Sequence, residues 1–256
     1  MTVLDLAQAP ARPPLTRLAL VELRKMTDTR AGRWLLAIIA LVAVATVVVF
    51  MSVRPADEQS AGQLFALSQI GVGLLLPVVG ILAVTGEWSQ RTALTTFALV
   101  PQRLRVLTAK LLAAVVLATG FVLLGLALGV LGRALGGVLG VSSGDWDLPV
   151  RAVASMLLVE IATVLIGVAF GALLMNTPVA IVLYFVLPTV WTTVGSMVKA
   201  LRSASAWLDT NRAFEPLTGD TPASGVEWAR AGTAVAVWMV VPLVIGAYRL
   251  MRREVK

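Results

Sequence analysis

The sequence predicts an all-α integral membrane protein, and three observations lead to this prediction. Apolar residues make up 58% of the chain and charged residues only 14%, with a mean hydropathy of +0.89. A soluble domain has about a quarter of its residues charged, so this chain has too little charge to cover a surface that faces water. Its apolar residues also form long continuous runs, which excludes the alternating pattern of a membrane β-barrel.

Six segments are long enough to cross a bilayer. A spanning helix needs about 20 mostly apolar residues, because the hydrocarbon core is roughly 30 Å thick. Five of the segments contain no ionisable residue, and the fourth contains one, Glu160. Residues 1–256 are therefore expected to form a single transmembrane domain, with spans at residues 34–53, 64–85, 111–131, 153–174, 179–198 and 231–248.

The basic residues predict the orientation of these spans. If both termini lie in the cytoplasm, 14 of the 21 Lys and Arg residues are inside and 7 are outside, as expected for a membrane protein. Acidic residues show the opposite bias, with 5 inside and 8 outside. The net charge of +7 thus reflects membrane topology, and we expect the bilayer rather than nucleic acid as the partner of these charges.

Residues 15–33, which precede the first span, have the periodicity of an amphipathic helix. Such a helix is expected to lie in the membrane interface, with its basic side chains close to anionic headgroups. The alternative is a solvated segment before the first span, whose charges only set the membrane topology. The apolar face holds Leu15, Leu18, Ala19, Leu23 and Met26, and the charged face holds Arg17, Arg24, Lys25 and Asp28.

The connection at residues 86–110, between spans two and three, is the most informative segment. Helical sequence continues from Thr92 to Leu99, and Pro101 then breaks it before the third span. A short cytoplasmic helix with an apolar stripe is suited to docking in a groove of another protein. The alternative is a loop that only carries topogenic charge. The connection at residues 199–230 is instead the largest outer segment.

Polar residues inside the spans are candidates for a transport path. Glu160 is the only ionisable residue well inside a span, and a charge there costs roughly 2.5 kcal/mol or more. It could serve transport, or it could be a carboxyl that bonds to a neighbouring helix. The fifth span holds a dense polar cluster, which could line the path or form ordinary bonds between helices: Thr189, Trp191, Thr192, Thr193 and Ser196.

The chain lacks the residues that most catalytic and metal sites need. It contains no Cys and no His, which excludes thiolate nucleophiles, histidine bases and the usual zinc sites. It also contains no Gly-Lys pair, so it has no phosphate-binding loop of the Walker type. We therefore expect no catalysis, no metal and no cofactor on this chain. A secondary transporter or channel that works alone is the alternative, although no internal repeat supports it.

Three segments, in order, resemble the permeases of type-2 ABC exporters, and actinobacterial members in particular. Residues 86–92, with the following Arg103-x-Arg105 and 110–113, look like the inner loop of that family. Residues 22–36 are similar to its interfacial elbow helix running into the first span, and residues 238–254 are similar to its closing segment. The resemblance covers nearly the whole chain.

The resemblance implies a function and its partners. In that family the inner loop is a coupling helix that docks on a separate ATPase subunit, so two cytoplasmic ATPase subunits carrying ATP and Mg would be expected. A second permease protomer, identical or different, would complete the path in a bacterial cytoplasmic membrane. The cargo would be a hydrophobic small molecule, drug, natural product or lipid. By matching position, the ATPase contacts would be Glu87, Trp88, Gln90, Arg91 and Thr92.

Overall fold

The computed structural model describes residues 13–219 and 221–252, and this part of the chain contains helices and no strand. The basic residues Arg12, Arg253 and Lys256, which entered the predicted orientation, lie outside it. Six helical runs are long and apolar enough to cross a membrane, which confirms the predicted all-α membrane fold. They are α2 (Arg30–Val53), α3 (Ala61–Ser89), α5 (Arg103–Val138), α6 (Val150–Leu174), α7 (Thr177–Met197), and the continuous run of α10 (Gly225–Val235), η3 (Ala236–Val240) and α11 (Val241–Arg252).

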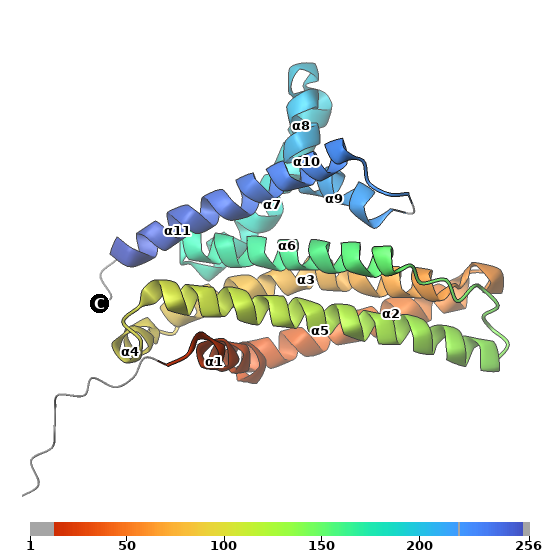
Figure 1. The fold of residues 1–256 in the computed structure, drawn as a ribbon, viewed down its shortest axis with the longest axis horizontal. Helices are drawn as coiled ribbons and strands as arrows, with labels where there is room; N and C mark the ends of the chain where they lie inside the picture. The colour runs from red at the N-terminus through yellow and green to blue at the C-terminus, as the bar shows by residue number, and fades with distance from the viewer. Residues whose placement is uncertain (1–12, 220, 253–256) are drawn as a thin grey trace, which may run out of the picture.

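Helices α2, α3, α5 and α6 run side by side, and α3 packs against each of the other three (Figure 1). Small residues allow the closest approaches. A side chain at Gly167 would meet the backbone of Pro77 on α3, and one at Gly171 would meet that of Ile81. On α5, a side chain at Gly125 would collide with Gln69 of α3. The glycine pairs at one-turn spacing in α5 and α6 therefore serve packing within the chain.

Helix α5 is longer than the apolar run at residues 111–131, because it already begins at Arg103, directly after the Pro101 break. Residues 103–110, which were assigned to the connection before the third span, are thus the first turns of α5. The last membrane run is also longer than residues 231–248, and it contains a π-helical stretch, η3. Pro242 follows this stretch and has no N–H to donate to a helical hydrogen bond. The wider π-turn accommodates this missing hydrogen bond.

Short helices fill the connections. Helix α1 (Leu15–Asp28) precedes the bundle, and Thr29 separates it from α2 by accepting a hydrogen bond from the Gly32 amide. The connection between α3 and α5 contains α4 (Ala93–Leu99), and the connection between α2 and α3 contains η1 (Ala56–Glu58). The segment after α7 forms η2 (Lys199–Leu201), α8 (Arg202–Leu208) and α9 (Thr210–Thr218), which fold back against α6, α7 and α10.

Helix α7 has little contact with the rest of the bundle and, together with α8, stands away from it in Figure 1. Only Ala180 and Gly195 of α7 are buried. Its remaining surface is rich in exposed apolar side chains such as Val182, Val186 and Val190. Lipid or another membrane helix can cover such a surface without cost, because both are apolar.

Candidate functional site

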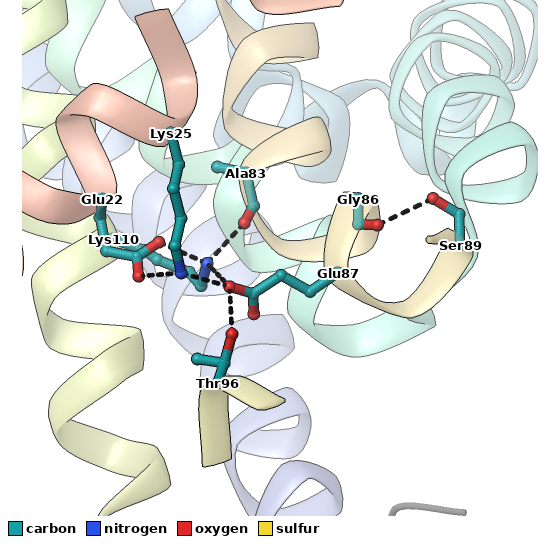
Figure 2. Close-up of polar contacts among 8 residues, drawn as sticks. All are labelled: Glu22, Lys25, Ala83, Gly86, Glu87, Ser89, Thr96 and Lys110. Carbon is teal, nitrogen blue, oxygen red and sulfur yellow. Dashed lines mark hydrogen bonds and ion pairs between the residues drawn. The ribbon is translucent and has the colours of Figure 1, made fainter. Parts of the chain in front are cut away.

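Four charged side chains form a closed ring at the end of the bundle that carries α1 and α4 (Figure 2). Lys25 Nζ lies 2.8 Å from Glu22 Oε1 and 2.8 Å from Glu87 Oε1. Lys110 Nζ lies 2.6 Å from Glu22 Oε2 and 3.1 Å from the same oxygen of Glu87. Each lysine therefore bridges both acids, and the ring as a whole carries no net charge. We call Glu22, Lys25, Glu87 and Lys110 the charge ring.

Three helices supply the charge ring. Glu22 and Lys25 stand three residues apart on α1, which places them on the same side of that helix. Glu87 lies in the last turn of α3, and Lys110 lies in the second turn of α5. The ring thus joins α1 to two of the membrane helices at one point.

The charge ring is largely withdrawn from water. Glu22, Glu87 and Lys110 are 5%, 9% and 3% exposed. Further hydrogen bonds support them, because Lys110 Nζ also donates to the Ala83 carbonyl at 2.8 Å. A buried ion pair tolerates the loss of one partner poorly, since the remaining charge is left without compensation. The ring therefore fixes how α1 sits against α3 and α5.

Lys25 is the most exposed member of the ring. Burial by itself would lower the pKa of Lys25, but hydrogen bonds and charges from Glu22 and Glu87 outweigh it and raise this pKa above its ordinary value. Lys25 is therefore charged throughout the physiological pH range.

Glu87 also binds the short inner helix. The Thr96 hydroxyl on α4 donates to Glu87 Oε1 at 3.2 Å. The backbone carbonyl of the same residue accepts from the Thr92 amide at 2.9 Å. One residue thus holds both the beginning and the middle of the α4 segment, so α4 is tied to the charge ring rather than loosely attached.

Arg91 occupies an unusual backbone position between α3 and α4. Its φ angle is 56°, in the left-handed region where glycine is normally found. The Arg91 amide donates to the Trp88 carbonyl while the Thr92 amide donates to that of Glu87, which is the bond pattern of a Schellman helix end. A glycine would relieve this position, so the arginine side chain is held there at a cost of about 1 kcal/mol.

The inner face of α4 is packed, and its outer face is open. Phe97 lies 6.4 Å from the Trp88 ring, and the Arg103 guanidinium lies 5.2 Å above Phe97. Leu99, on the side of α4 away from Phe97, is 78% exposed, and Leu94 is 53% exposed. Exposed apolar side chains held at a fixed position are a feature of docking surfaces.

The five residues predicted to contact an ATPase thus fall into two groups. Glu87 points into the charge ring, and Trp88 is half-buried against Phe97. Gln90, Arg91 and Thr92 are exposed on the surface next to the open face of α4. We call Gln90, Arg91, Thr92, Leu94 and Leu99 the loop surface. Their contact with another protein remains a prediction.

The six transport-path candidates do not form one cluster. Glu160 is 2% exposed and lies beside Gly73 of α3, where the missing side chain leaves room for its carboxyl. One of its oxygens, Oε2, and the indole Nε1 of Trp191 are buried without a hydrogen-bond partner among the described residues. Thr192 donates to Asp209 at 2.8 Å and so secures α9, whereas Thr189, Thr193 and Ser196 are exposed on α7 and bond to their own helix backbone.

Comparison with protein-family models and with curated proteins found no match for this chain.

Sequence reasoning did not identify Glu22, Lys25 and Lys110 as parts of a site. Glu22 entered only as a member of a resembling segment, and Lys110 only there and as a topogenic charge, whereas Lys25 was placed on the charged face of residues 15–33 and expected near anionic headgroups. One signal in the sequence was available: Glu22 stands three residues before Lys25 on the predicted helix, so the two side chains lie on the same side. Lys110 gives no such signal, because only the fold brings it to Glu22, which lies 88 positions earlier in the chain.

Proposed function

We propose that this chain is the permease subunit of an ATP-driven exporter of the type-2 ABC class. Two permease protomers, identical or different, would enclose the path, and two separate ATPase subunits would bind at the loop surface. ATP and Mg²⁺ would bind to those subunits, and this chain would contribute no catalytic residue. The cargo class proposed is a hydrophobic small molecule, drug, natural product or lipid.

One observation supports this proposal most strongly. The loop surface is exposed, while the same segment is bound through Glu87 to the charge ring and hence to α1, α3 and α5. A partner that pulls on α4 would therefore move three helices rather than a free loop. This is the physical requirement for converting nucleotide binding elsewhere into opening or closing of a membrane path.

The loosely packed α7 is consistent with a second protomer. Its apolar surface is available for a neighbour, and the exposed hydroxyls of Thr189, Thr193 and Ser196 lie on the same helix. In the proposed dimer, α7 would lie at or near the path between the protomers. Glu160 would influence this path only indirectly, from inside the bundle, where it lies at the contact of α6 with α3.

Purification of the tagged chain in a mild detergent tests the proposed function. We expect a soluble ATPase with a phosphate-binding loop to co-purify in a fixed ratio, and the complex to hydrolyse ATP in proteoliposomes. The hydrolysis should change when a transported compound is added. Failure of every ATPase encoded beside this chain to bind it would contradict the proposal.

A further inference from the structure

The outward face of α1 and the beginning of α2 carry arginines with no protein partner. Arg17, Arg24, Arg30 and Arg33 are all exposed, and none forms a hydrogen bond or ion pair through its guanidinium within residues 13–219 and 221–252. Other arginines do have partners: Arg103 donates to the Leu250 carbonyl at 2.6 Å, for example. Unpartnered guanidinium groups are thus concentrated at this end of the bundle.

These arginines are accompanied by exposed apolar side chains. Leu20 is 61% exposed on α1, and Trp34 is 72% exposed in the first turns of α2. Arg17 and Arg24 are two helical turns apart and lie on one side of α1, on the face opposite Glu22. One acid, Asp28, is exposed nearby, so the net charge of this surface is strongly positive.

The chemistry of this surface selects one class of partner. Guanidinium groups form bidentate hydrogen bonds with phosphate oxygens, and adjacent apolar side chains with an exposed Trp favour the edge of a bilayer. An acidic protein or a nucleic acid would match the charge but would leave Leu20 and Trp34 exposed to water. A lipid surface matches both features.

We propose that Arg17, Arg24, Arg30 and Arg33 bind anionic phospholipid headgroups, and that the charge ring transmits this contact to α4. The ring lies on another side of the same helix α1, where Glu22 pairs with Lys25 and Lys110, and Lys25 also pairs with Glu87. A shift or a loosening of α1 at the membrane surface is therefore transmitted to Glu87, which holds Thr92 and Thr96. The charge of the lipid thus helps to set the position of the loop surface.

Thermal unfolding of the purified chain in an uncharged detergent tests the binding step. Short-chain phosphatidylglycerol is expected to raise the unfolding temperature by at least about 2 °C more than phosphatidylcholine with the same acyl chains. About 0.5 M NaCl should remove most of this difference, since exposed charges are screened at high salt. Replacement of the four arginines by Gln should abolish it. Arg202→Gln, at an exposed arginine on α8, is the matched control and should preserve it.

Several outcomes would overturn the proposal. Equal effects of the two lipids, or an unchanged difference in the four-arginine variant, would show that these residues do not bind anionic lipid. An equal stabilisation by inorganic phosphate alone would reveal a free-anion site instead of a lipid surface. If the four-arginine variant folds poorly, a lipid difference in the wild-type chain that persists at about 0.5 M NaCl still contradicts the proposal.

Hydrogen exchange of the α4 amides tests the transmission step. In the wild-type chain, phosphatidylglycerol should slow exchange at residues 92–99 relative to phosphatidylcholine. Lys25→Met should keep the lipid-dependent unfolding shift but lose this protection. Lipid-independent exchange in the wild-type chain, or full protection in Lys25→Met, would contradict transmission through the ring. Both experiments use the chain without any ATPase, so their failure is distinguishable from failure of the proposed function.

Discussion

Lys110 Nζ lies 2.6 Å from Glu22 Oε2, which joins the second turn of α5 to the middle of α1 across 88 residues of sequence. Both side chains are buried, at 3% and 5% exposure. This contact is the least exposed side of the charge ring. It links α1 to the bundle independently of the segment that contains α4.

Substitution of one member of this buried pair should lower the stability of the folded chain. Lys110→Met is expected to lower the free energy of unfolding by about 3 kcal/mol, because it leaves two carboxylates with only Lys25 as a partner. The measurement is denaturant unfolding in mixed micelles. The double variant Glu22→Gln, Lys110→Met should lose less than the sum of the two single losses, by at least about 1 kcal/mol. Strict additivity would argue against a direct pair.

Substitution of Lys25 should destabilise the chain less than substitution of Lys110, because the Lys25 side chain is 40% exposed. Solvent screening reduces its contribution, so Lys25→Met is expected to cost about 1 kcal/mol or less. Since the pKa of Lys25 is raised in the folded chain, this contribution is fully present below the unfolded pKa of about 10.4 and is lost as pH rises through the folded value. The stability difference between wild type and Lys25→Met should therefore be constant from about pH 7 to 9 and should shrink in stronger alkali. A difference that changes between pH 7 and 9 would contradict this assignment.

Arg91 allows stability and partner binding to be separated. Arg91→Gly should raise the free energy of unfolding by about 1 kcal/mol, because glycine adopts the observed φ of 56° without strain. Arg91→Ala keeps the strain and should leave stability near the wild-type value. If the guanidinium contacts an ATPase, both variants should reduce ATP hydrolysis by the complex to a similar extent. Reduced hydrolysis in only one of them would point to backbone geometry rather than to the side chain.

The apolar part of the loop surface should matter for association alone. Leu99 is 78% exposed, so Leu99→Asp is expected to change the unfolding temperature by less than about 2 °C while it reduces co-purification of the ATPase at least tenfold. Leu139→Asp is the matched control, because Leu139 is 73% exposed and follows the opposite end of α5. Loss of the ATPase in both variants would indicate a general defect in the complex.

The fold could be predicted from the sequence because membrane spans depend on local composition. Each apolar run must satisfy its backbone hydrogen bonds within itself, so six runs give six helical spans whatever surrounds them. The short helix α4 was predictable for a similar reason, since Pro101 ends it locally. The eleven α-helices within residues 13–219 and 221–252 did not all follow from such rules. Helix α9 depends on the carboxylate of Asp209, which receives hydrogen bonds from two backbone amides and from Thr192 of α7.

The site was harder to predict because its members come from distant parts of the chain. The importance of the 86–92 segment was visible in the sequence, but the direction of each side chain was not. Glu87 and Arg91 are four residues apart, yet the Glu87 side chain is buried in the ring and Arg91 is exposed beyond the helix end. Only the packing of α1 against α3 and α5 determines this difference.

A cross-linking measurement at α4 tests the proposed function most directly. The chain has no cysteine, so Leu99→Cys introduces a unique thiol on the loop surface and Leu139→Cys introduces one at the other end of α5. In native membranes treated with a short bifunctional maleimide, the account predicts a cross-link from position 99 to an ATPase subunit, with a yield that changes when ATP is added. Position 139 should give none. A chain that forms no ATPase cross-link from position 99, or forms equal amounts from both positions, would contradict docking at α4.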